Sequence, residues 1–284
     1  MSDAPGVLYV VATPIGNLGD ITVRALETLK LVQRVAAEDT RRTRALLSHH
    51  GISGKPVDAL HEHSSEGAVL RLASLIESGE NIALVTDAGT PVVSDPGNDL
   101  VQACIQRNLR VIPIPGASAV LTALVGSGLG TGHGFRFMGF LPREGPERFE
   151  ALRHAAETVE PVVFFEAPGR VKSTLLDFAR IAPERPACVA RELTKLHEEF
   201  ARGTVQSLSE RDDWMGEVCI VLGARQGMPD EALPSDAALE ARIAEELAKG
   251  THAKNIAELL SAWSGRPKRD VYERVVRSKQ THKG

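Results

Sequence analysis

The chain of 284 residues has few aromatic side chains, since Phe, Trp and Tyr together make up 4% of it. Ala, Val and Leu must therefore supply most of its core. It has no run of about 18 apolar residues, the length that a membrane-spanning helix requires. Its first residues lack the basic segment and apolar stretch of a secretory signal. We therefore expect a cytoplasmic protein with no membrane contact.

Cysteine is also scarce, and the three residues of this type, Cys104, Cys188 and Cys219, lie far apart in apolar surroundings. No CxxC pair or Cys/His spacing typical of a zinc site accompanies them. Because disulfides form mainly in oxidising compartments, we expect buried, reduced thiols in a reducing compartment.

The formal net charge of −4 does not indicate a partner, but its distribution along the chain is uneven. From Lys249 to the end there are nine basic and three acidic residues, which gives this tail +6 and the remainder −10. A basic terminal module on an acidic body predicts contact with an anion. The alternative is a tail whose charges serve only solubility.

Apolar runs of strand length alternate with helical patterns in the first part of the chain. This rhythm predicts a mostly parallel sheet with helices packed on it. We expect strands at 7–12, 35–37, 57–60, 81–85 and 110–112. The helices should begin at Asp20 as N-cap, at about Arg42, at Ser64 or Ser65, and at Asp95.

A second block of the same kind begins near Phe135 and is followed by a purely helical segment. We expect strands at 135–140, 162–166, 187–192 and 217–222, with helices near 145–157 and 170–180. The stretch 226–235, rich in Gly, Pro and Asp, is interpreted as a linker. Three short amphipathic helices at 236–279 resemble a helix-turn-helix unit. The fold class is thus α/β, with predicted domains at 1–120, 121–227 and 228–284, the last all helical.

Three loops at expected strand ends carry the pattern that favours ligand binding. The GxGxxG fingerprint is absent after the first strand, which ends instead in Thr-Pro-Ile-Gly-Asn at 13–17. Asp-Ala-Gly-Thr-Pro at 87–91 and Pro-Gly-Ala-Ser at 115–118 follow two later strands. Open α/β sheets bind ligands at the carboxyl ends of their strands. Each loop alone is also explained by an ordinary turn, a turn-organising Asp or a helix-capping Ser.

Together, in this order and spacing, the three loops resemble the tetrapyrrole-methylase-like methyltransferases. Within that superfamily the chain is most similar to the ribosomal small-subunit RNA methyltransferase I family. The strings that carry the resemblance are LYVVATPIGNLGDIT, AAEDTRRT, LHEHS, ALVTDAGTPVVSDPG, VVFFEAPGR and ARELTK. The resemblance covers about residues 7–225 and extends more loosely through the helical unit.

The resemblance implies two α/β domains with S-adenosylmethionine in a cleft between them, usually in a homodimer. It also implies 2′-O-methylation of a cytidine in small-subunit ribosomal RNA. Carried over by position, the cofactor-binding residues are Pro14, Asp87, Ala88, Gly89, Val92, Ser118 and Ala119. The chain departs from the porphyrin-acting relatives, as the RNA branch does, by Asp-Ala-Gly-Thr-Pro in place of Gly-Asp-Pro and by Phe165-Glu166 in place of Tyr-Met.

A ribose hydroxyl is a poor nucleophile, so a general base is expected to assist the transfer. The adjacent acids Glu38 and Asp39 follow a short strand, and Asp39 with Arg41 forms either a ribose and phosphate site or a structural ion pair. Residues 191–195 alternate along an expected strand, which would place Lys195 on one face. Lys195 then holds phosphate, lowers the pKa of a neighbouring group, or is a solvated strand end. The catalytic candidates are Asp39, Arg41, Glu166 and Lys195, with Glu38 and Glu192 as further acids.

The RNA partner predicts basic contacts and no metal. His61-Glu62-His63 is weak evidence for a metal ion, and we expect it to contact RNA or form ordinary hydrogen bonds. The RNA is recognised either as a naked strand or, as we expect, in the assembled small subunit. The main alternatives are a tetrapyrrole C-methyltransferase and a non-catalytic RNA-binding factor. The expected RNA contacts are Arg41, Arg42, Arg44, Arg143, Arg170, Lys172, Arg266, Lys268, Arg269, Arg274 and Arg277.

Overall fold

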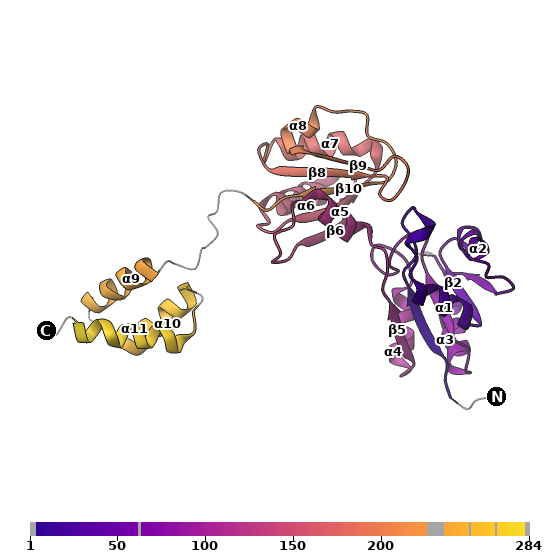
Figure 1. Cartoon of the computed structure of the whole chain (residues 1–284), viewed down its shortest axis with the longest axis horizontal. Helices are drawn as coiled ribbons and strands as arrows, with labels where there is room; N and C mark the ends of the chain where they lie inside the picture. Colours follow the sequence, from indigo (N-terminus) through magenta and orange to yellow (C-terminus); the bar gives the residue numbers. More distant parts are fainter. Residues whose placement is uncertain (1–3, 62–63, 226–235, 250, 265, 282–284) are drawn as a thin grey trace. The chain divides into compact units, whose positions relative to one another are not determined.

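The computed structural model describes residues 4–61, 64–225, 236–249, 251–264 and 266–281 (Figure 1). The chain divides into two compact units, residues 1–225 and 226–284. The first unit holds two five-stranded sheets and the second holds three helices. The α/β fold class and the helical C-terminal segment are therefore confirmed.

The first sheet is wholly parallel, in the order β3-β2-β4-β1-β5. Its strands are β1 (Val7–Val11), β2 (Arg34–Ala37), β3 (Val57–Ala59), β4 (Ile82–Val85) and β5 (Arg110–Ile114). The central strand β4 is buried along its whole length because helices cover both faces of the sheet. The helices α1 (Val23–Leu31) and α2 (Thr40–His49) pack on one face, and α3 (Glu66–Glu77) and α4 (Asn98–Gln106) on the other.

Three helix starts differ from their predicted positions for local reasons. Helix α1 begins at Val23 because Thr22, not Asp20, accepts the capping hydrogen bond, from the Ala25 amide. Asp20 lies in a short 3-10 turn, η1 (Leu18–Asp20). Helix α2 begins at Thr40, with Asp39 as its N-cap. Helix α4 begins only at Asn98, since the preceding residue has a left-handed backbone conformation.

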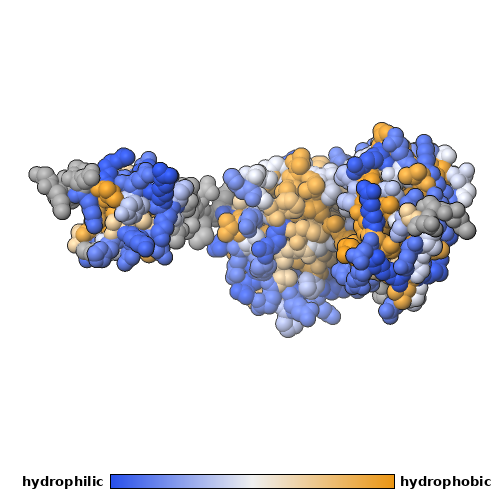
Figure 2. Space-filling model, turned by 90° about the horizontal axis from the view of Figure 1, so that it is seen from below, coloured by the Kyte–Doolittle hydropathy of each residue, from blue (hydrophilic) through white to orange (hydrophobic). Residues whose placement is uncertain are grey.

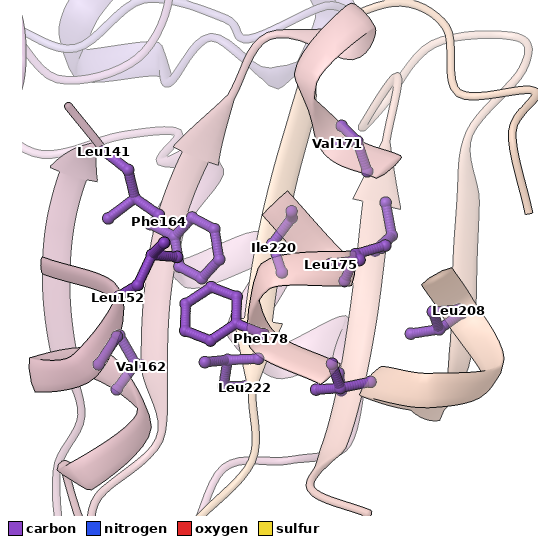
Figure 3. Packing of buried hydrophobic residues seen from close by; sticks show 14 of the residues in the cluster. Leu141, Leu152, Val162, Phe164, Val171, Leu175, Phe178, Leu208, Ile220 and Leu222 are labelled. Carbon is purple, nitrogen blue, oxygen red and sulfur yellow. The ribbon is translucent and has the colours of Figure 1, made fainter. Parts of the chain in front are cut away.

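The second sheet has the order β6-β7-β10-β8-β9, with β6 parallel to β7 and the other neighbours antiparallel. Helix α5 (Ala119–Ser127) packs on one face, and α6 (Gly145–Glu157), α7 (Pro168–Ala179) and α8 (Val205–Ser209) on the other. Figure 3 shows the core beneath the latter helices, where the rings of Phe164 and Phe178 lie 5.6 Å apart. The strands are β6 (Arg136–Phe140), β7 (Val162–Glu166), β8 (Pro186–Arg191), β9 (Glu199–Thr204) and β10 (Val218–Leu222).

The helical unit consists of α9 (Asp236–Ala248), α10 (Ala253–Ser264) and α11 (Lys268–Thr281). Leu259, expected on the apolar face of α10, is 56% exposed. The expected linker at 226–235 and the side chain of Trp263 lie outside the described part of the chain. The core of this unit is formed by Leu239, Ile243, Ile256, Ala257, Leu260, Val271 and Val275.

Candidate functional site

The three motif loops meet at the carboxyl edge of the first sheet. Thr13 and Gly89 exchange two backbone hydrogen bonds, of 2.8 and 3.1 Å. The Thr13 hydroxyl also donates to the Thr86 carbonyl, and the Thr90 hydroxyl donates to the Ala117 carbonyl at 3.3 Å. The loops that the sequence places at separate strand ends therefore form one connected surface.

A cavity of about 370 Å³ opens between this surface and the end of the second sheet. On the first side it is lined by Ala88, Gly89, Ser118 and Ala119, four of the seven predicted cofactor-binding residues. Ser118 also caps α5, because its hydroxyl accepts a hydrogen bond from the Leu121 amide. The opposite side of this first cavity is mostly apolar and is lined by Phe140, Phe165, Pro168, Leu193, Val218 and Cys219.

A second cavity, of about 400 Å³, adjoins the first. Ile15, Ala88 and Glu217 line both cavities. Pro14 and Asp87, predicted to bind the cofactor, line the second cavity but not the first. Val92 lines neither, and its side chain packs against the core of the first sheet. Of the seven predicted cofactor-binding residues, four thus line the first cavity, two line only the second, and one lines neither.

A group of acidic side chains stands beside the loop at 86–91. Asp87 accepts a hydrogen bond from the Asp39 amide and pairs with Arg42 at 3.3 Å. Burial raises the pKa of Asp87 above its ordinary value. Burial likewise raises the pKa of Asp95 to about 6, with repulsion from Glu38 and Asp87 adding to the effect. Asp95 lines the first cavity, so its carboxyl group faces the space where a ligand would bind.

Asp39 and Arg41, two predicted catalytic residues, form an ion pair with each other at 3.1 Å on the first turn of α2. The Arg41 side chain is 88% exposed, and neither residue lines a cavity. Hydrogen bonds from Arg41 lower the pKa of Asp39 to about 2, so its carboxylate is a weak base. Of the two predicted interpretations, the geometry favours the structural ion pair.

Glu166 lies in the wall of the first cavity, but both of its carboxylate oxygens are engaged by the protein. Oε1 accepts from the Ala167 amide at 2.9 Å and lies 3.1 Å from the Arg170 Nε. Oε2 accepts from the Thr174 hydroxyl at 2.7 Å and lies 3.9 Å from Arg148. The side chain is 1% exposed. These contacts argue against the predicted role of general base, and indicate that Glu166 holds α7 and the neighbouring loop in place.

Lys195 lines the second cavity, but it lies in a turn and not in the predicted strand. Strand β8 ends at Arg191, and Glu192 and Thr194 have left-handed φ angles of 50° and 65°. The expected strand at 191–195 is therefore wrong, and the chain turns instead. In this turn the Lys195 ammonium donates to Glu192 at 2.9 Å and to Glu217 at 3.0 Å. Burial lowers the pKa of Lys195, but these two hydrogen bonds outweigh it, so its pKa is raised.

Two glycines allow this turn to pack against its neighbours. A Cβ atom on Gly16 would lie 2.6 Å from the Lys195 Cγ and 2.8 Å from the Leu193 carbonyl oxygen. A Cβ atom on Gly216, which has a φ of 80°, would lie 2.3 Å from the Glu192 carboxylate. The Asn17 amide also donates to the Thr194 hydroxyl at 2.9 Å. The amides of Thr13 and Asn17 in the first loop therefore donate to other residues of the protein, and neither is left for a ligand.

The basic residues predicted to contact RNA are mostly paired with acids. In the body, Arg170 pairs with Glu166, and Lys172 with Asp212. The helical unit at 236–281 has nine basic and seven acidic residues, a net charge of +2, since α9 is acidic. Its surface is therefore less positive than the tail from Lys249 onward suggested. Its ion pairs join Arg266 and Arg274 to Asp236, Lys268 to Glu258, and Arg269 to Glu273.

Other site residues escaped prediction. Asp95 stands in one of the quoted motif strings, yet its position was interpreted as the start of a helix. Glu217 was placed in an expected strand, and only the fold shows that it faces both cavities. Phe140 is 61% exposed although it lines the first cavity, and the sequence indicated it only as the last residue of an expected strand.

The three cysteines are buried, as predicted, and burial raises the pKa of Cys219 to about 12. Within the described ranges, no group of three or more His, Cys, Asp or Glu side chains has the arrangement to hold a metal ion. Glu62 and His63 lie outside those ranges. No helix among the described residues is long and apolar enough to span a membrane.

The chain is similar in sequence and in fold to known methyltransferases. Residues 7–209 match the family model of the Tetrapyrrole (Corrin/Porphyrin) Methylases. Ribosomal RNA small subunit methyltransferase I of Halalkalibacterium halodurans is 42% identical over 278 residues, covering 95% of this chain and 94% of that protein. The Synechocystis protein of the same name is 43% identical over 274 residues, covering 94% and 96%. Uroporphyrin-III C-methyl transferase from Thermus thermophilus, solved with S-adenyl homocysteine, has a TM-score of 0.57 at 20% identity over 77% of this chain and 97% of its own.

Proposed function

The chain belongs to the ribosomal RNA small subunit methyltransferase I family of the tetrapyrrole methylases, and from this we propose the reaction that it catalyses. It transfers a methyl group from S-adenosylmethionine to the 2′-hydroxyl of a cytidine in small-subunit ribosomal RNA. We further propose that it acts in the cytoplasm, where its buried cysteines remain reduced.

The first cavity carries this proposal, because its volume and lining suit the cofactor. Its volume of about 370 Å³ lies in the range of small-molecule sites. Apolar walls from Phe165 and Val218 suit a flat adenine ring, and the Ser118 hydroxyl and Asp95 carboxylate suit polar groups. S-adenosylmethionine supplies an activated, sulfonium-bound methyl group when bound. The protein then has mainly to position the acceptor hydroxyl, an effect worth about 7–11 kcal/mol in favourable cases.

Ribosomal RNA is favoured over a tetrapyrrole as substrate by the names of the full-length relatives at about 40% identity. The solved tetrapyrrole enzyme shares the fold at only 20% identity. A non-catalytic RNA-binding factor is disfavoured because the loops around the first cavity remain open to a ligand. We propose the assembled small subunit as the substrate, since few aromatic side chains are present to read a naked strand by stacking.

A homodimer is part of the proposal, and an exposed apolar surface supports it. Helix α5 is apolar on both sides: Val120 and Ala123 pack on the second sheet, while Leu121 and Val125 are 52% and 80% exposed. Figure 2 shows a broad apolar area on the part of the chain that carries this sheet. If a second copy covers this face, Val125→Asp should give a monomer in sedimentation, whereas the wild-type protein should sediment as a dimer.

The test of the reaction is methyl transfer to purified small subunits that lack this modification. With radiolabelled S-adenosylmethionine, nuclease digestion and mass analysis should yield one 2′-O-methylcytidine per subunit. Ala119→Phe, which fills the first cavity, should abolish cofactor binding in calorimetry, and Ala237→Phe on the exposed face of α9 should not. Absence of any new methylated nucleoside with the wild-type protein would contradict the proposed function.

A further inference from the structure

We propose that the second cavity holds the nucleotide that is methylated, and that Glu217 accepts a hydrogen bond there from the ribose hydroxyl. This inference rests on the proposed function, since it requires an RNA acceptor and a cofactor in the first cavity. The two cavities adjoin at Ile15, Ala88 and Glu217. A hydroxyl group held in the second cavity therefore lies next to the contents of the first.

The charges of the two cavities differ in the way that this assignment requires. The described residues that line the first cavity include no Lys or Arg, and Asp95 and Glu217 bring carboxyl groups to it, whereas the buried Glu166 is paired with Arg170 and Arg148. Such a lining suits a ligand with sulfonium and ammonium groups. The second cavity is lined by Arg42 and Lys195. Because RNA carries a phosphate at every nucleotide, basic side chains favour its binding in this second space.

The walls of the second cavity match the parts of a nucleotide. Two ion pairs contribute to its lining: Arg42 with Asp87 at 3.3 Å, and Lys195 with Glu217 at 3.0 Å. The two cations can contact phosphate oxygens, and the two carboxylates can accept hydrogen bonds from ribose hydroxyls. The remaining surface includes apolar side chains that can contact a base, those of Leu18, Ala45 and Leu46.

Lys195 is not a solvated strand end, because the turn at 192–195 and two hydrogen bonds hold its side chain in the wall of the second cavity. The left-handed residues Glu192 and Thr194 direct the turn, and non-glycine residues with such φ angles concentrate at functional sites. Glu192 accepts from both the Lys195 ammonium and the Glu217 amide, at 2.9 Å each. The turn therefore fixes Lys195 and Glu217 relative to each other, with Glu217 at the junction of the cavities.

The experiment compares variants that fill one cavity or the other. Leu46→Trp should raise the KM for small subunits by about tenfold or more, a change of about 1.4 kcal/mol, while the Kd for S-adenosylmethionine stays within twofold. Ala119→Phe should show the reverse, with cofactor binding lost in calorimetry. Arg42→Ala and Lys195→Ala should raise the same KM and should each reduce the slope of log KM against log salt by about 1. Glu217→Gln should lower kcat with little change in either binding constant.

Arg24→Ala is the matched control, because Arg24 is an exposed arginine on α1, which packs on the same face of the first sheet as α2, and it lines neither cavity. Its KM should remain near that of the wild-type protein. An equal loss in Arg24→Ala and Arg42→Ala would overturn the inference, as would weakened cofactor binding in Leu46→Trp. A wild-type protein that binds S-adenosylmethionine but methylates no subunit would overturn the proposed function itself, a result distinct from both.

Discussion

Replacing Glu166 by alanine removes a buried carboxylate and leaves its partners behind. Arg170 and Arg148, 3.1 and 3.9 Å away, would keep their charges, and the Thr174 hydroxyl would lose its acceptor. Removing one partner of a buried ion pair typically costs about 3–5 kcal/mol of unfolding free energy. For a unit of 225 residues, each kcal/mol lowers Tm by about 2–4 °C. We therefore expect Glu166→Ala to lower Tm by roughly 6–20 °C.

Thermal unfolding followed by circular dichroism measures this change, with Thr174→Val as a milder variant that removes one hydrogen bond, worth about 0.5–1.5 kcal/mol. Glu166→Gln keeps an acceptor for the Ala167 amide and should retain kcat within about tenfold, whereas loss of a general base costs about 10²–10⁴-fold. A Tm for Glu166→Ala within 2 °C of wild type, roughly 1 kcal/mol or less, would refute the structural role. A loss of about 10³-fold in kcat for a fully folded Glu166→Gln would restore the catalytic one.

Three further changes test other parts of the unit. Gly16→Ala should collide with Lys195 and with the Leu193 carbonyl oxygen, and should lower both Tm and kcat/KM, the latter by about tenfold or more, measured by calorimetry and methyl transfer. Arg185→Met should lower the unfolding free energy by about 3 kcal/mol or more in urea titration, because the buried guanidinium donates to five backbone carbonyls, those of Ala155, Ala156, Thr158, Glu160 and Gly223. The raised pKa of Asp95, about 6, means that the contribution of Asp95 to the free energy of unfolding falls as pH rises from about 4 to 6. Asp95→Asn should therefore raise Tm at pH 7.5 but not at pH 4, and an equal effect at both would contradict this reasoning.

Local sequence was sufficient for strands with long apolar runs. Val162–Glu166 was predicted with its observed bounds because four consecutive apolar residues bury a central strand. Strand β9 escaped prediction because Glu199–Thr204 mixes charged, small and half-exposed residues, as an edge strand often does. The start of α4 was predicted too early because aspartate is a common N-cap residue. Asp95 instead lines the first cavity, and the helix begins three residues later, at Asn98.

At the site, the loops were predictable and the side-chain roles were not. The ends of adjacent parallel strands meet at one edge of a sheet, so the loops beginning at Thr13 and Asp87 had to lie close together. The partners of Glu166 come from α6 and α7, and no pattern in the sequence links them to it. The turn that carries Lys195 depends on the missing Cβ atoms of Gly16 and Gly216, which are remote from it in sequence.

The bridge between Thr13 and Gly89 also has a consequence for which molecules can react. It joins the loops that carry Ile15 and Ala88, two residues that line both cavities. Because alanine has only a methyl side chain, residue 88 takes up little space where the two cavities adjoin. A larger side chain at position 88 would therefore reduce the room for the acceptor and the cofactor together.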